Sequence, residues 1–226
     1  MANDIQSSIV RELVDSGIIS IKNGEFIMWD IPGILLPLNS VLLLNVLKEQ
    51  HPHISIQDLN YQVGKMHSHR GNNVLIRRFG YSPDKKLMQE SFGKSELLGM
   101  GLFEFLDFDA GRKVFTVSNS RTPYARQCLK VFGKQKFPVC HYLRGLVAGS
   151  FQAFYEDEPL LGVELACIAR GDPACMFRVK PEKDWDSSDP LVERQRVHDP
   201  LPEDVFDKLY SWENLISPDA GKPFQK

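Results

Sequence analysis

Apolar positions in the first thirty residues predict a short helix followed by a hairpin. Ile5, Ile9 and Leu13 recur every four residues, which places them on one face of a helix. Lys22-Asn23-Gly24 then provides a sequence typical of a hairpin turn. We therefore assign residues 1–30 to an N-terminal helix-hairpin appendage.

The next part of the chain switches between helical and strand-like spacing of its apolar residues. Leu59, Val63 and Met66 keep a helical spacing, whereas phenylalanines alternate with acidic residues from Phe103 onward. Helices are predicted over residues 38–50, 55–69, 83–98 and 139–155, and from Thr122-Pro123 onward. Strands are predicted over residues 103–108, 114–117, 161–169 and 174–179, the last two forming a hairpin around Arg170-Gly171-Asp172-Pro173. This order predicts one α+β domain over residues 31–181.

Two glycines stand out in the last predicted helix. Gly145 and Gly149 are four residues apart and therefore share one face, which we expect to pack closely on the sheet. After Pro181 the sequence becomes polar and contains several prolines, with helical character only over residues 202–214. We assign residues 182–226 to a C-terminal tail with a short helix, packed loosely or onto a partner.

Composition narrows the class of protein. The chain has 226 residues, of which 42% are hydrophobic and 25% charged, as expected for a globular protein with one substantial core. Its formal net charge of -2 provides no basic field, so we do not expect direct nucleic-acid binding. The longest apolar run, residues 34–46, is shorter than the roughly 20 residues of a membrane-spanning helix. The N-terminus lacks a secretory pattern, so we expect the cytoplasm.

Three cysteines and one glutamate carry the candidate chemistry. Cys140, Glu164, Cys167 and Cys175 form the pattern C-x(23)-E-x(2)-C-x(7)-C, and three thiolates with one carboxylate suit tetrahedral zinc. Cys167 and Cys175 flank the predicted turn symmetrically. Residues three apart on a regular strand face opposite sides, so joint ligation by Glu164 and Cys167 requires a bulge or a strand end between them.

Spacing alone leaves two other readings open. The cysteines are equally consistent with small buried core residues, because free cysteine is among the most buried residue types. A disulfide between Cys167 and Cys175 is geometrically allowed, although a reducing compartment disfavours it. Cys128 has no partner at a diagnostic spacing, and we assign it to the core.

The stretch from Phe137 to Pro181 resembles the 4-vinyl reductase domain family. The pattern is carried by Cys140-His141, Arg144-Gly145, Gly149, Glu164, Cys167, Gly171-Asp172-Pro173, Cys175 and Phe177. It is similar in particular to the sensory domains of phenol-responsive bacterial activators, and this resemblance implies a structural zinc held by the three cysteines and the glutamate. It also implies an α+β fold, with helices on a twisted antiparallel sheet, like TRAPP vesicle-tethering subunits and haem nitric-oxide sensor domains.

From the resemblance we expect a sensor or carrier of a hydrophobic or aromatic small molecule. The elements that would wall its pocket carry Phe92, Leu97, Leu98, Phe103, Phe105, Phe115 and Tyr124. An apolar helix face at Leu42, Leu43 and Val46 adds to the expectation of a homodimer. Two alternatives are a reductase subunit acting on a tetrapyrrole vinyl group and a dimeric scaffold resembling TRAPP subunits. No catalytic motif or electron-donor motif is visible, which favours a binding protein over an enzyme and leaves the reductase alternative open.

Overall fold

Two compact units make up the chain, residues 1–37 with 201–226, and residues 38–200. The computed structural model describes Asp15, residues 19–22, 25–28, 31–33, 55–79, 82, 84–94, 99–198 and 200–201. The helices expected over residues 38–50 and 202–214, and all but Asp15 of the one expected near the N-terminus, lie outside these ranges.

The first unit contains a small antiparallel sheet of β1 (Ile19–Lys22), β2 (Glu25–Met28) and β3 (Ile31–Gly33). Lys22 pairs with Glu25, which confirms the hairpin expected at Asn23-Gly24. The third strand was not expected, because Pro32 lacks a backbone donor and favours an irregular connector. Residues 31–33 pair with β2, although the sequence assigned them to the following domain.

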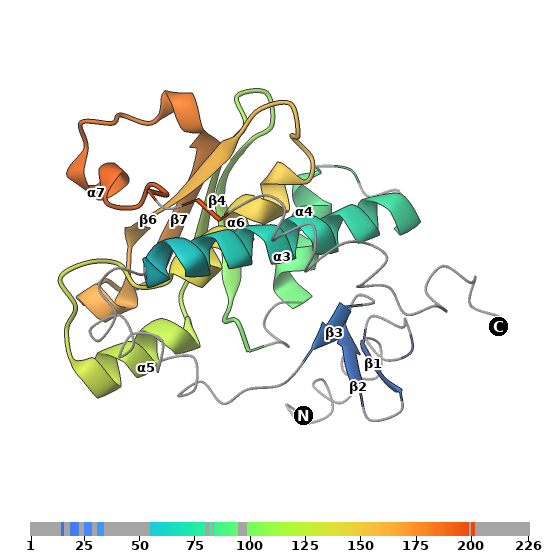
Figure 1. Cartoon of the computed structure of the whole chain (residues 1–226), viewed down its shortest axis with the longest axis horizontal. Helices are drawn as coiled ribbons and strands as arrows, with labels where there is room; N and C mark the ends of the chain where they lie inside the picture. Colours follow the sequence, from blue (N-terminus) through green and yellow to red (C-terminus); the bar gives the residue numbers. More distant parts are fainter. Residues whose placement is uncertain are drawn as a thin grey trace. The chain divides into compact units, whose positions relative to one another are not determined.

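The second unit is built on a four-stranded antiparallel sheet (Figure 1). Its strands are β4 (Phe103–Asp109), β5 (Val114–Asn119), β6 (Leu160–Ala166) and β7 (Cys175–Pro181). Their order is β4-β5-β7-β6, so two hairpins distant in sequence meet through β5 and β7, and β6 forms one edge. Together with the helices below, this sheet confirms the predicted α+β class.

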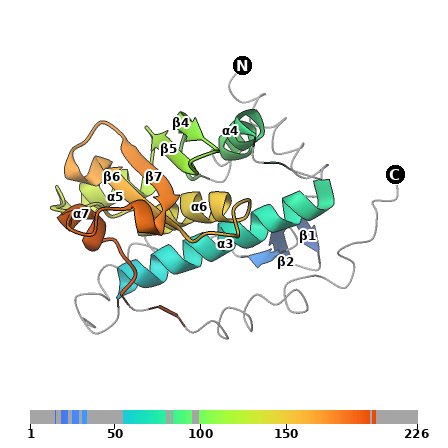
Figure 2. The same ribbon diagram turned by 90° about the horizontal axis from the view of Figure 1, so that it is seen from above.

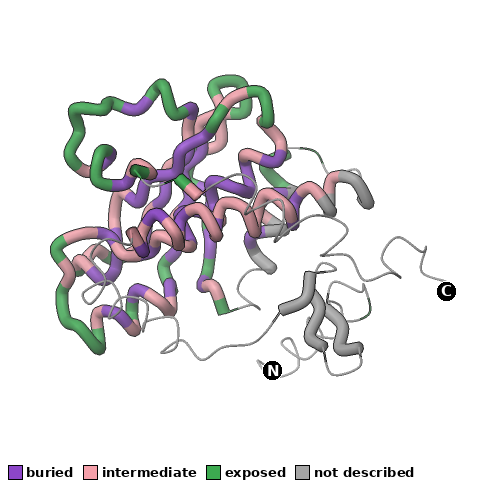
Figure 3. The backbone as a smooth tube through the Cα atoms, viewed as in Figure 1, coloured by how far each residue is buried: buried purple, intermediate pink, exposed green. Residues whose placement is uncertain are grey.

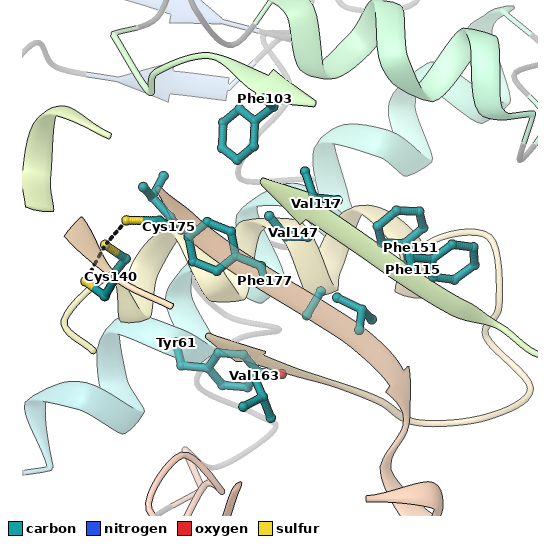
Figure 4. Packing of buried hydrophobic residues seen from close by; sticks show 14 of the residues in the cluster. Tyr61, Phe103, Phe115, Val117, Cys140, Val147, Phe151, Val163, Cys175 and Phe177 are labelled. Atoms are coloured by element: carbon teal, nitrogen blue, oxygen red, sulfur yellow. Dashed lines mark hydrogen bonds between the residues drawn. The ribbon is translucent and has the colours of Figure 1, made fainter. Parts of the chain in front are cut away.

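Helices α3 (Ile56–Phe79) and α6 (His141–Gln152) form two further layers. Figure 2 shows α6 lying between the sheet and α3. Most of α6 is buried, as Figure 3 shows. The remaining helices are α4 (Lys85–Lys94), α5 (Pro123–Phe132) and the single turn α7 (Pro190–Glu193). In the core, Val147 and Phe151 of α6 pack with buried sheet residues such as Phe115 and Phe177 (Figure 4).

Small residues allow α3 and α6 to cross with their backbones in contact. A Cβ atom added to Gly145 would lie 2.1 Å from the carbonyl oxygen of Tyr61, and one added to Gly149 would lie 1.9 Å from that of Lys65. From α3, a Cβ on Gly64 would lie 2.2 Å from the carbonyl oxygen of Tyr142. The two glycines of α6 share one face as predicted, but the expectation that this face packs on the sheet is wrong. The glycine face packs on α3. Larger side chains of α6, such as those of Val147 and Phe151, occupy the opposite face and pack against the sheet.

Two element boundaries also differ from the sequence prediction. Helix α3 continues to Phe79, ten residues beyond the expected end. Strand β6 ends at Ala166, and a 3-10 turn, η1 (Ile168–Arg170), replaces the expected last residues of the strand. The early end of β6 affects the site described below, since it changes the direction of the chain at Cys167.

Residues 182–198, which we call the clasp, belong to the second unit and pack against β6, so the expectation of a loosely packed tail is wrong for this segment. The clasp contains a 3-10 turn, η2 (Glu182–Asp184), and α7, and it lies beside β6 (Figure 1). Trp185 and Val192 are buried, and the Trp185 indole nitrogen donates to the Leu161 carbonyl at 3.0 Å. The polar composition concealed this packing because the few apolar residues of the clasp, among them Trp185 and Val192, show no regular spacing along the chain.

Among the described residues, no helix is long and apolar enough to cross a membrane.

Candidate metal centre

Four segments bring the predicted ligands to one point. Cys140 is the N-cap residue of α6, Glu164 lies in β6, Cys167 follows the end of β6, and Cys175 is the first residue of β7. All four side chains are buried. Their convergence joins the layer of α6 to two strands of the sheet.

The donor atoms have the spacing of a tetrahedral site. One atom from each residue lies within 4.8 Å of all the others. The Cys140 sulfur is 3.9 Å from that of Cys167 and 3.7 Å from that of Cys175, and Figure 4 shows the Cys140 and Cys175 sulfurs pointing toward each other. With zinc–sulfur bonds of about 2.3 Å, the edge of a regular tetrahedron is about 3.8 Å. The cluster therefore needs little rearrangement to surround a zinc ion.

An irregularity in β6 resolves the difficulty of placing Glu164 and Cys167 together. The register between β6 and β7 shifts between Glu164, which pairs with Phe177, and Ala166, which pairs with Met176. The extra residue at this bulge, and the end of the strand at Ala166, turn the Cys167 side chain to the same side as that of Glu164. The bulge that shared ligation requires is thus present.

The turn after β6 is held by its own hydrogen bonds. Gly171 adopts a left-handed conformation with φ of 91°, which glycine reaches at little cost. The Asp172 carboxylate accepts from the Cys167 amide at 2.8 Å, and the Cys167 carbonyl accepts from the Arg170 amide at the same distance. The Ile168 amide approaches the Cys175 sulfur at 3.4 Å. These hydrogen bonds within the protein fix Cys167 and Cys175 relative to each other without a metal ion.

The electrostatics of the cluster favour a cation. Burial raises the pKa of Cys140 and that of Glu164 well above their ordinary values. Contacts from Cys140 and Cys167 instead lower the pKa of Cys175 to about 5. Burial thus opposes ionisation of Cys140 and Glu164 when no cation is bound. A divalent cation would allow all four donors to ionise, and the N-terminus of α6 also favours negative charge there.

One atom of the cluster lacks a partner. Glu164 Oε2 accepts from the Cys140 amide at 2.9 Å, whereas the buried Oε1 has no hydrogen-bond partner among the residues that the structure describes. An unsatisfied buried carboxylate oxygen is costly, and a metal ion would satisfy it. The residues present therefore fit zinc. All four cysteines of the chain are free, so the structure contains no disulfide between Cys167 and Cys175. Burial of plain core cysteines would not explain a carboxylate at the same point.

Cys128 lies outside this cluster, on α5. It is buried, and burial raises the pKa of its thiol to about 11. The thiol is therefore protonated at neutral pH, which suits a core residue.

Four of the seven predicted pocket residues belong to one aromatic cluster. Phe92 contacts Phe103 and Phe105 edge to face, each with ring centroids 5.3 Å apart. Phe115 stacks on Phe151 of α6 at 3.9 Å. The two groups are joined by contacts of Phe92 and Phe105 with Phe151. Tyr124 is half-buried at the edge of the core, and Leu97 and Leu98 lie outside the described residues.

Sequence reasoning missed two polar residues beside the centre. Arg144 is fully buried, and its Nη1 donates to the Gly162 carbonyl at 2.9 Å and to the Gln195 carbonyl. Gln195 is also buried and bonds the backbone of Glu164. Arg144 was part of the family pattern, but nothing in the sequence gave it this role. Gln195 lies in the segment assigned to the tail and has no local signal.

Comparison with known proteins gives a short sequence match. No protein-family model matches the sequence. An uncharacterised protein of Methanocaldococcus jannaschii is 39% identical over 46 residues, which are 20% of this chain and 25% of that protein. The match thus spans about a quarter of that relative.

Structural likeness is broader. The phenol-responsive sensory domain of the transcription activator PoxR, solved with phenol, matches with a TM-score of 0.67 and 17% identity, over 86% of this chain and 96% of that domain. A vinyl-4-reductase family protein of M. jannaschii matches with a TM-score of 0.44 and 16% identity, over 79% of this chain and 93% of that protein. A trafficking protein particle complex subunit 3 of Naegleria fowleri, covalently bound to palmitic acid, gives 0.42 and 14%, over 64% and 96%. The PoxR match confirms the fold expected from the sequence resemblance.

Proposed function

We propose that this chain is a small-molecule-binding sensor domain stabilised by a structural zinc ion, with Cys140, Glu164, Cys167 and Cys175 as ligands. The observation that carries the proposal is the convergence of three thiols and one carboxylate, buried together at tetrahedral spacing. The similarity in fold to the PoxR sensory domain supports the sensor role.

The role of the zinc would be structural. Four protein ligands complete a tetrahedral shell, so no position is left for a substrate or a water molecule. When bound, the ion would crosslink the start of α6 to the end of β6 and the start of β7. This crosslink would fix the stacking of α6 on the sheet, and hence the walls of any pocket between the layers.

The aromatic cluster is the proposed binding region for an apolar or aromatic molecule. Phe92, Phe103 and Phe105 offer ring faces and edges, and they lie on α4 and β4. The neighbouring Tyr155, whose ring lies 5.6 Å from that of Phe115, has a buried hydroxyl without a hydrogen-bond partner among the described residues. Because an unsatisfied buried hydroxyl costs free energy, a ligand with a polar group could gain affinity by bonding it.

Native mass spectrometry of untagged protein tests both parts of the proposal. We expect one zinc ion per chain, and a chain without metal would refute the centre. Zinc-loaded protein would then be screened by thermal shift against phenols, tetrapyrroles and acyl chains. A ligand at a hundredfold excess over its Kd should stabilise the fold by about 2.7 kcal/mol. No shift with any of these compounds would refute the sensor role and leave the zinc proposal standing.

A further inference from the structure

The outer edge of β6 is covered by side chains instead of another strand. Backbone groups of Leu160, Gly162 and Glu164 would otherwise lack partners, because β6 is the last strand of the sheet. Leu160 is bonded by Lys65 of α3 and by Gln152, the last residue of α6. Gly162 is bonded by Tyr61 of α3 and Arg144 of α6, and Glu164 by Gln195 of the clasp. The partner of the metal-site residue is thus the one supplied by the clasp.

Gln195 binds Glu164 as a neighbouring strand would. Its Oε1 accepts from the Glu164 amide at 2.9 Å, and its Nε2 donates to the Glu164 carbonyl at 3.0 Å. The register of β6 shifts immediately afterwards, so this is the point where pairing with β7 becomes irregular. The amide of Gln195 therefore holds the backbone of Glu164 where the regular ladder does so least.

Arg144 holds Gln195 in place. The guanidinium lies 3.9 Å above the Tyr61 ring, and its Nη1 bonds the carbonyls of both Gly162 and Gln195. Burial lowers the pKa of Arg144 to about 10, so it remains charged at neutral pH. The buried guanidinium of Arg144 thus links β6 to the clasp, beside the thiols and the carboxyl group of the candidate metal centre.

We propose that Gln195, seated by Arg144, is a positioning residue for the metal ligand Glu164, and that metal binding in turn fixes the clasp on β6. The inference rests on the proposed zinc centre. Hydrogen bonds that hold a ligand orient its donor atom toward the metal, and loss of such a partner typically lowers metal affinity 10–100-fold. Coupling between two binding events is reciprocal. The free energy by which the docked clasp stabilises bound zinc therefore equals the free energy by which bound zinc stabilises the docked clasp.

The test compares two glutamines that bond the same strand. Gln195→Ala removes both bonds to Glu164. The matched control, Gln152→Ala, removes the bond to Leu160 at the far end of β6 and two bonds to the carbonyls of Tyr155 and Glu158. Zinc affinity is measured by competition with a chromophoric chelator. We expect Gln195→Ala to weaken zinc binding about tenfold or more and Gln152→Ala to leave it within about twofold. Equal effects of the two changes would overturn the inference.

A second measurement needs no variant. Hydrogen exchange of residues 185–198 is followed in the wild-type chain with zinc and after chelation. We expect faster exchange in this segment after chelation, and unchanged exchange there would overturn the coupling. Gln195→Glu provides a further check, because its carboxylate keeps the shape but cannot donate to the Glu164 carbonyl. It should weaken zinc binding as Gln195→Ala does. Wild-type protein that contains no zinc refutes the centre itself, whereas bound zinc with unchanged affinity in Gln195→Ala refutes only this inference.

Discussion

Replacing Gly149 with alanine tests the crossing of α3 and α6, on which the placement of Cys140 depends. The added Cβ would lie 1.9 Å from the carbonyl oxygen of Lys65, 2.7 Å from its carbon and 3.0 Å from the amide nitrogen of His69. Real Cβ contacts stay above 3.0 Å, so the helices would have to separate by roughly 1 Å. The sheet lies behind α6 and opposes this movement.

Two effects of opposite sign decide the expected result. Alanine stabilises a helix by about 1 kcal/mol relative to glycine. Overpacking costs about 1–3 kcal/mol, and a clash with backbone belongs at the upper end because no side chain can rotate away. We therefore expect Gly149→Ala to lower the free energy of unfolding by about 2 kcal/mol. Gly145→Ala, whose Cβ would lie 2.1 Å from the Tyr61 carbonyl oxygen, should behave similarly.

Urea denaturation of the zinc-loaded protein measures this change as a shift in midpoint at constant slope. Gly111→Ala is the control, since its Cβ would meet only Asp109 Oδ1 at 3.5 Å, an ordinary contact. It should change stability by no more than about 0.5 kcal/mol. If Gly149→Ala instead stabilises the protein by about 1 kcal/mol, helix propensity acts alone and the close crossing is wrong.

Three further predictions concern the metal and the assembly. Cys175→Ser should lower the free energy of unfolding by more than about 2 kcal/mol, because it removes a ligand of the proposed zinc ion. Cys128→Ser removes no ligand and should lower it by about 1 kcal/mol. Equal melting shifts for the two variants would count against the centre. Burial raises the pKa of Cys140 and of Glu164, so zinc must displace protons and its affinity should fall as the pH falls, about tenfold or more per pH unit between pH 8 and 6. Chelator competition at three pH values measures this, and a flat profile would contradict it. We also propose a homodimer, and light scattering that gives the monomer mass at micromolar concentration would remove this proposal.

The sequence by itself predicted the fold class and the group of residues that converge at the centre. Local signals were sufficient for the hairpin at Asn23-Gly24, for the turn after β6 and for the helix that begins at Pro123 after the N-cap residue Thr122. The spacing of Glu164 and Cys167 even required the bulge that the structure contains, because side chains alternate strictly along a regular strand. The hairpin, the turn, the start of the helix and the bulge each depend on residues close together in the chain.

Only the tertiary structure decided which surfaces meet. The spacing of Gly145 and Gly149 fixed a shared face, but whether that face met sheet or helix depended on α3, some eighty residues earlier in the chain. The clasp was assigned to the tail because its sequence is polar. It packs because Trp185 and Val192 enter the core, and because Gln195 and Arg144 bond backbone groups at the edge of β6. Apolar burial leaves a periodic pattern in a sequence, whereas a single polar side chain that completes a distant hydrogen bond leaves none.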